Sequence, residues 1–201
     1  MTGLRQTHRR GGSARVLRIV GGTWRGRRLR FPPSPGIRPT PDRVRETLFN
    51  WLAPHVLDAR CLDLFAGSGA LGLEALSRGA AHVTFVEQDV RAARAIEACL
   101  LLWDPAHHDD WQLAGVDARF FLAGSAQPFD IVFLDPPFGS GLLEAACGQL
   151  ERSGWLAPHA RIYLECPAGA EPVVPVGWTR AKTKKAGQVG YHLFQRGNHA
   201  E

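Results

Sequence analysis

The alternation of short apolar strands with helices over most of the chain is the feature that most constrains its fold. Five strand-like segments lie at residues 61–65, 82–87, 111–116, 131–134 and 161–165. Helical segments lie between them at residues 71–76, 90–102 and 142–150. Strands that alternate with helices are joined by crossover connections, which leave helices on both faces of a parallel sheet. The sequence therefore predicts an α/β fold with a mostly parallel, Rossmann-like sheet.

Two segments outside this alternation are predicted to form antiparallel hairpins. Residues 178–184 and 190–195 flank a turn at residues 185–188 that contains a glycine. Near the N-terminus, the apolar segment at residues 16–20 is followed by a glycine-rich turn and a second strand ending at Phe31. Each pattern is typical of two strands that pair directly through a short connection.

A proline-rich linker at residues 32–36 separates the N-terminal hairpin from a predicted helix. Thr40 is the expected N-cap of this helix, and Pro41 is its expected first residue. The apolar face of the helix would consist of Val44, Leu48, Trp51 and Leu52. We therefore expect two parts, an arginine-rich extension at residues 1–37 and a main domain at residues 38–201.

Length and composition are those of an ordinary globular domain. The chain has 201 residues, of which 45% are hydrophobic, so it can bury a core without a metal or disulfide staple. No apolar run approaches the roughly 20 residues of a membrane-spanning helix, and the N-terminus lacks the apolar segment of a secretory signal. The four cysteines lack C-x-x-C spacing, which predicts reduced thiols and no metal site. We expect a cytoplasmic monomer, with a transit peptide at the N-terminus as the alternative.

Positive charge is concentrated near the N-terminus. Residues 1–45 contain 12 arginines and a single acid, Asp42, whereas the rest of the chain has a net charge of −6. A polyanion such as RNA is the natural partner of such a segment, although a solvated charged surface is the simpler alternative. Arginine also suits bidentate recognition of phosphate. The predicted RNA contacts on the two hairpins are Arg25, Arg27, Arg28, Arg30, Arg180, Lys182, Lys184 and Lys185.

A glycine-rich loop follows the first strand of the alternation. Gly67, Gly69 and Gly72 match G-x-G-x-x-G, and Glu87 lies 20 residues after Gly67 at the end of the next strand. This arrangement is typical of dinucleotide-binding sites, so NAD is one candidate ligand. Asp63 at the end of the first strand would repel a pyrophosphate but attract the ammonium and sulfonium of S-adenosylmethionine. The sequence therefore favours S-adenosylmethionine, whose ribose hydroxyls Glu87 could bind.

Asp117 and Ala118 follow the third strand and have two possible roles. Aspartate is a preferred N-cap, so Asp117 could begin a helix. A carboxylate or backbone group here could equally contact the adenine edge of the cofactor, and one residue can do both.

The sequence Asp135-Pro136-Pro137-Phe138 directly follows the fourth strand and is the most specific motif in the chain. Prolines cannot donate backbone hydrogen bonds, so this loop presents acceptors, which suit a planar NH₂ group. Hydrogen bonds to the Asp135 carboxylate and the Pro136 carbonyl would favour a pyramidal nitrogen with a usable lone pair. Phe138 can stack on the face of a base. The alternative is a structural turn with a buried phenylalanine.

The last motif resembles the [DN]-P-P-[FYW] loop of methyltransferases that act on exocyclic amines. More closely, the chain resembles the bacterial small-subunit ribosomal RNA guanine-N2 methyltransferases of the RsmD type. The similarity extends from about residue 15 to residue 196. The stretches that carry it are 18–27, 38–52, 62–72, 135–138 and 186–189.

The resemblance implies a class I methyltransferase fold with a seven-stranded sheet, and N2-methylation of one guanine in 16S ribosomal RNA. The partner would be the small ribosomal subunit or its assembly intermediate, and S-adenosylmethionine the methyl donor. Arg38 and Thr40 would close the cofactor site. The cofactor itself would be lined by Asp63, Gly67, Gly69, Glu87, Gln88, Asp117 and Ala118.

Three other functions share part of this pattern. A protein-glutamine methyltransferase can use a similar loop but does not need the arginine-rich hairpin. A DNA methyltransferase normally carries a target-recognition domain, for which 201 residues leave no room. A non-catalytic RNA-binding protein would need the hairpin but not the motif at residues 135–138.

Overall fold

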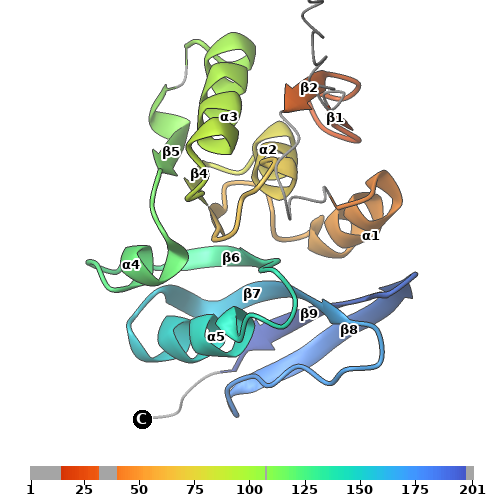
Figure 1. The fold of residues 1–201 in the computed structure, drawn as a ribbon, viewed down its shortest axis with the longest axis vertical. Coiled ribbons are helices and arrows are strands. Elements are labelled where there is room, and N and C mark those ends of the chain that lie inside the picture. The colour runs from red at the N-terminus through yellow and green to blue at the C-terminus, as the bar shows by residue number, and fades with distance from the viewer. Residues whose placement is uncertain (1–14, 32–39, 107, 198–201) are drawn as a thin grey trace, which may run out of the picture.

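The computed structural model describes residues 15–31, 40–106 and 108–197 of the chain (Figure 1). Its strands are β1 (Arg15–Arg18), β2 (Arg28–Phe31), β3 (Arg60–Asp63), β4 (His82–Val86), β5 (Trp111–Ala114), β6 (Phe129–Leu134), β7 (Leu156–Pro167), β8 (Trp178–Ala186) and β9 (Val189–Arg196). Its helices are α1 (Asp42–Leu52), α2 (Ala70–Ser77), α3 (Val90–Trp103), α4 (Ala118–Leu122) and α5 (Leu142–Arg152), with a short 3-10 turn η1 (His108–Asp110).

Seven strands form one sheet in the order β5-β4-β3-β6-β7-β9-β8. The strands from β5 to β7 are parallel, and β9 joins antiparallel to both β7 and β8. The predicted α/β architecture is therefore confirmed. The chain moves outward from β3 to β5 and then returns to place β6 on the other side of β3. Such a reversal opens a crevice at the carboxyl ends of the strands, where folds of this type bind ligands.

Alternating side chains of the strands fill two hydrophobic clusters, one on each face of the sheet. Ile131 and Phe133 of β6 belong to the cluster beneath α1, α2 and α3. Val132 and Leu134 of the same strand belong to the cluster shared with α4 and α5. Because both faces are covered, the central residues of the inner strands are mostly apolar on both faces, which is why these strands read as short apolar runs in the sequence.

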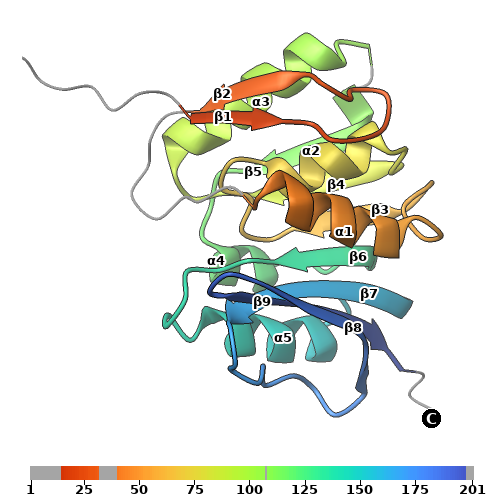
Figure 2. The same cartoon turned by 90° about the vertical axis from the view of Figure 1, so that its right-hand side faces the viewer.

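The N-terminal hairpin of β1 and β2 packs over α2 and α3 (Figure 2). Its buried residues Leu17, Ile19, Trp24, Leu29 and Phe31 belong to the same cluster as α1 and α2. The predicted boundary at residue 37 lies outside the described residues. The arginines of the hairpin are thus attached to a segment that shares its core with the main sheet.

Polar groups inside this packing fix the turn of the hairpin. The buried Glu74 carboxylate accepts hydrogen bonds from the Val20 backbone N–H (2.9 Å) and from Arg78 Nε (2.9 Å). The Ser77 hydroxyl donates to the Gly21 carbonyl (2.6 Å). Gly22 has a φ of +76°, and a Cβ atom there would lie 1.7 Å from the Ser77 carbonyl oxygen. Only glycine fits this approach of the turn to α2.

Arg45 of α1 lies at the centre of the same network and is fully buried. Its guanidinium donates to Asp42 Oδ1 (2.6 Å) and to Glu74 Oε2 (3.4 Å). It also donates to the Arg18 carbonyl of β1 (2.7 Å). One guanidinium therefore connects α1, α2 and the hairpin.

Some local expectations need correction. The N-cap of α1 is Pro41, without a side-chain cap, and the predicted Thr40 cap is wrong because the Thr40 hydroxyl instead bonds to Glu165. Strand β7 is longer than predicted, because Leu156 also pairs with Phe129 of β6, and a register shift separates this pair from the regular pairing that begins at Arg161. The short helix α4 confirms the alternative in which Asp117 begins a helix.

Two further expectations concern the cysteines and the membrane. The four cysteines are free and buried. Among the helices of the described residues, none has the length and apolar character needed to cross a membrane.

Candidate active site

Four predicted acidic residues follow four neighbouring strands of the sheet. Asp63 ends β3, Glu87 follows β4, Asp117 follows the end of β5, and Asp135 follows β6. The parallel register pairs Asp63 with Phe85 of β4 and with Phe133 of β6, so these strands end at the same edge. The fold thus brings together residues that are up to 72 positions apart in the sequence.

The glycine loop between β3 and α2 is held by two of these carboxylates. The Gly72 N–H donates to Asp63 Oδ2 (2.9 Å), and the Gly67 N–H donates to Glu87 Oε2 (2.6 Å). Gly69, with a φ of +73°, is the N-cap of α2. Gly72 has a different role, since a Cβ atom there would lie 2.2 Å from the Phe85 ring. The spacing of the glycines therefore reflects both the turn and the packing of α2 on β4.

Negative charge is unfavourable at this end of the sheet. Burial raises the pKa of Asp63 to about 7, the Gly72 hydrogen bond opposes the rise, and the Glu87 charge adds to it. Burial likewise raises the pKa of Glu87, against the hydrogen bonds from the Asp89 and Gly67 N–H groups. A bound cation would relieve this repulsion. The ammonium and sulfonium of S-adenosylmethionine meet that requirement, whereas the phosphates of NAD do not.

Asp117 is the N-cap of α4, which was one of the two roles predicted for it. Its Oδ1 atom accepts from the Arg119 N–H (2.8 Å), and its carboxylate pairs with the Arg119 guanidinium at 2.9 Å. Hydrogen bonds and charge from Arg119 lower the pKa of Asp117. Ala118 is half-buried beside it, and Gln88 is exposed after β4. The contact of all three residues with a cofactor stays a prediction.

The loop after β6 combines a half-buried carboxylate with an exposed ring. Burial, together with the charges of Glu165 and Asp63, raises the pKa of Asp135 well above its usual value. Pro136 is buried, and the Pro137 carbonyl accepts from the Ser140 hydroxyl (2.6 Å). Phe138 is 46% exposed. This exposure disagrees with the alternative of a structural turn around a buried phenylalanine, and it leaves a ring face available for stacking.

Sequence reasoning missed three side chains at this edge of the sheet. Glu165 of β7 is buried, and its Oε1 atom accepts from the Tyr163 hydroxyl (2.7 Å). Phe120 on α4, three residues after the Asp117 cap, is 74% exposed. The available signal for Glu165 was its position at the end of an apolar strand, which is the position that identified Asp63.

The predicted RNA contacts form two groups at opposite ends of the sheet (Figure 2). In the hairpin, Arg25, Arg28 and Arg30 are exposed, while Arg27 donates to the Trp103 carbonyl (2.9 Å). The second group lies on the edge strand β8, where Arg180 pairs with Glu171 and covers the Phe194 ring. The remaining members Lys182, Lys184 and Lys185 are exposed. Arg38 lies outside the described residues.

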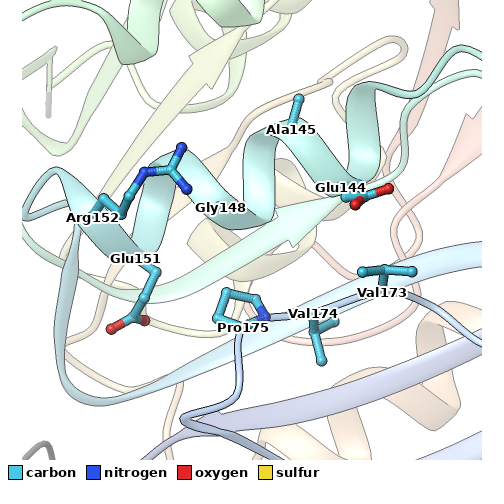
Figure 3. A pocket seen from close by; sticks show the side chains of 8 residues that line it. All are labelled: Glu144, Ala145, Gly148, Glu151, Arg152, Val173, Val174 and Pro175. Carbon is cyan, nitrogen blue, oxygen red and sulfur yellow. The ribbon is translucent and has the colours of Figure 1, made fainter.

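Two cavities lie away from this edge of the sheet. A cavity of about 370 Å³ lies between α5 and residues 173–175 (Figure 3). Its Glu151 accepts from Trp178 Nε1 (2.7 Å) and pairs with Arg196, which indicates a structural role. A second cavity of about 340 Å³ lies near the start of β3 and includes His55 and Arg161. Neither contains a predicted site residue.

Comparisons with known proteins agree with this geometry. Residues 17–195 match the family model described as conserved hypothetical protein 95. Ribosomal RNA small subunit methyltransferase D of Escherichia coli (strain K12) is 51% identical over 90% of this chain and 90% of its own length. The protein of the same name from Haemophilus influenzae is 44% identical over 89% of this chain and 93% of its own length. The chain belongs to the RsmD family.

Solved structures support the same conclusion. A structure titled as the putative methyltransferase yhhF from Escherichia coli is 51% identical, with a TM-score of 0.81 over 90% of this chain and 98% of that chain. A putative methylase from Haemophilus influenzae has a TM-score of 0.79 at 41% identity, over 91% of this chain and 99% of that chain. Membership of the RsmD family confirms the prediction of an S-adenosylmethionine-dependent methyltransferase with a Rossmann-like fold.

Proposed function

We propose that the protein transfers a methyl group from S-adenosylmethionine to the N2 amine of one guanine in 16S ribosomal RNA. The observation that carries the proposal is the loop after β6, where the half-buried Asp135 precedes the exposed ring of Phe138. It lies at the same edge of the sheet as the glycine loop and Asp63. The names of the relatives and their coverage of nearly the whole chain support the RNA substrate.

The residues present fit the methyl donor. Asp63 and Glu87 would stabilise its positive charge or bind its ribose, and the loop of Gly67 and Gly69 would lie against it. Asp117, next to Ala118, would face the adenine, with Gln88 near the ribose. Thr40 begins the segment that leads into α1, and together with Arg38 it would close the site.

The target amine needs activation, because its lone pair is delocalised into the guanine ring. The Asp135 carboxylate and the Pro136 carbonyl would accept its two N–H groups and favour a pyramidal nitrogen. Phe138 would stack on the base and hold the nitrogen in line with the methyl group. As the nitrogen attacks, the N–C bond forms and the S–C bond breaks, and a proton then leaves the nitrogen.

Recognition of the RNA would come from the two basic groups on the hairpin and on β8. Their exposed arginines and lysines would contact phosphates, which position an RNA without reading its sequence. We propose that the substrate is the small ribosomal subunit or its assembly intermediate, and that a monomer acts on it in the cytoplasm. The contacts would be Arg25, Arg27, Arg28, Arg30, Arg180, Lys182, Lys184 and Lys185.

The test is single-turnover methyl transfer by the Asp135→Asn variant to small-subunit particles from a strain that lacks the enzyme. Asparagine keeps the shape but replaces one acceptor by a donor that opposes the amine. The rate should fall roughly 10²–10³-fold, as when other transition-state hydrogen bonds are lost. Cofactor affinity, measured by calorimetry, should change much less.

Asp130→Asn is the matched control, because Asp130 lies on the same strand at its other end and accepts a bond from the Arg60 N–H. It should keep the wild-type rate. A full rate for Asp135→Asn would refute the catalytic role of the loop. Mass mapping of the methylated RNA would identify the product, and a methyl group found on protein instead would refute the RNA substrate.

A further inference from the structure

Three carboxylates lie in a row on three adjacent strands of the sheet. Asp63 of β3 is paired with Phe133 of β6, and Asp135 follows two residues later. Leu134 is paired with Leu164 of β7, which places Asp135 level with Glu165. Phe133 and Tyr163 belong to the cluster beneath α1, and side chains two residues apart on a strand share a face. Asp135 and Glu165 therefore lie side by side on the α1 face.

Glu165 is held in place by hydroxyl groups on two elements. It is 5% exposed, and the Tyr163 hydroxyl donates to its Oε1 atom at 2.7 Å. The Thr40 hydroxyl, at the start of the α1 segment, also donates to it. Both bonds favour the charged form of the carboxylate against the cost of burial. A buried carboxylate beside the catalytic aspartate, fixed from two sides, is more than the packing of β7 requires.

We propose that Glu165 is a positioning residue that makes Asp135 the acceptor of the proton released by the methylated amine. This proposal rests on the catalytic role of Asp135 stated above. Glu165 does not touch the base. It acts through its charge, which makes a proton on Asp135 more favourable than on an isolated aspartate.

The proton balance of the step is simple. When the guanine nitrogen attacks, its lone pair forms the N–C bond, and the electrons of the S–C bond go to sulfur. The nitrogen then carries a positive charge and two hydrogens. One of them passes to the Asp135 carboxylate, which leaves neutral N2-methylguanine and neutral S-adenosylhomocysteine. Asp135 afterwards releases that proton to water.

The groups that face Asp135 support this role. Burial raises the pKa of Asp135, and the charge of Glu165 adds more to the rise than that of Asp63. Tyr163 is also buried here, and its pKa is raised chiefly by burial and by Glu165, with smaller effects of Asp135 and Tyr191. None of these neighbours is positively charged. The positive charge of a bound cofactor would offset the negative charge of Asp63. Glu165 is then the neighbour whose charge still raises the proton affinity of Asp135.

The experiment is the pH dependence of the single-turnover rate, measured on small-subunit particles from a strain that lacks the enzyme. Glu165→Gln keeps an acceptor for Tyr163 and Thr40 but removes the charge. Because a neighbouring charge is lost, the pKa of Asp135 should fall. The acid limb of the profile should therefore move by about one pH unit toward lower pH. Cofactor affinity should stay within about twofold.

Two further variants make the result decisive. Tyr163→Phe removes a hydrogen bond that stabilises the charged form of Glu165. It should therefore move the acid limb in the same direction by a smaller amount. This variant provides the test if Glu165→Gln does not fold. Glu144→Gln makes the same chemical change at an exposed position of α5 and should leave the limb unchanged. The proposal would be overturned if the acid limb of both β7 variants stayed within about 0.2 pH unit of the wild-type limb. The expected shift is about one pH unit. Loss of activity in Asp135→Asn would in that case leave the proposed function intact.

Discussion

The buried carboxylate of Glu74 should be essential for attachment of the arginine-bearing hairpin. Glu74→Met keeps the length of the side chain but removes an acceptor used by Val20, Arg78 and Arg45. Both Glu74 and Arg45 have no exposed side-chain surface. Breaking a buried ion pair by removing one partner costs about 3–5 kcal/mol, because the other charge stays buried. Asp42 still pairs with Arg45, so the lower end of this range applies.

The free energy of unfolding is measured by urea denaturation and the melting temperature by calorimetry. A loss of about 3 kcal/mol corresponds to a decrease of roughly 6–12 °C for a chain of this size. The double variant Arg45→Met/Glu74→Met removes both charges and should be no less stable than the single variant, since a buried pair can be replaced by apolar groups at little cost. Glu97→Met, at an exposed position of α3, is the control and should change stability by less than about 0.5 kcal/mol. A loss below about 1 kcal/mol for Glu74→Met would refute the reasoning, because it lies outside the range for a broken buried pair.

Three other results are expected. Phe138→Ala should lower the single-turnover rate by removing a stacking surface worth about 1–3 kcal/mol, whereas Phe138→Tyr should keep it; equal rates in both would contradict stacking. Arg28→Ala and Arg30→Ala should each reduce the salt dependence of RNA binding by about one slope unit and leave cofactor affinity unchanged, and an unaltered slope would mean that these arginines only face solvent. Cofactor affinity should increase as pH rises through about 7, because the folded state raises the pKa of Asp63 to that value and the bound cation prefers its charged form. Without cofactor, the stability that Asp63 contributes is present below its unfolded pKa near 4 and is lost as pH rises through 7. Calorimetry in two buffers should detect proton release near pH 7, and affinity that is independent of pH would contradict this account.

The sequence predicted the sheet well because burial on both faces produces continuous apolar strands. Asp63, Glu87 and Asp135 could be found in the same way, because each is a carboxylate that ends an apolar strand. The residue types at the ends of the strands were therefore enough to identify the edge of the sheet that carries the candidate active site.

Contacts between distant segments could not be predicted in this way. Thr40 has the residue type and position of an N-cap, and only the neighbouring β7 explains why its hydroxyl bonds to Glu165 instead. Arg45 lies on the buried face of α1, three residues before Leu48, where an arginine would ordinarily be assigned to solvent. Its burial depends on acceptors from β1 and α2 that no local pattern reveals.

The short helix α2 has a consequence for how a target could be chosen. Its first residue follows Gly69 of the glycine loop, and its last residue, Ser77, bonds to the turn of the hairpin. Eight helical residues span only about 12 Å and do not stretch. If the arginines of the hairpin bind phosphates, α2 fixes the distance between these phosphates and the methyl donor. The enzyme would then select its guanine by measuring along the folded RNA, with no need to read the bases around it.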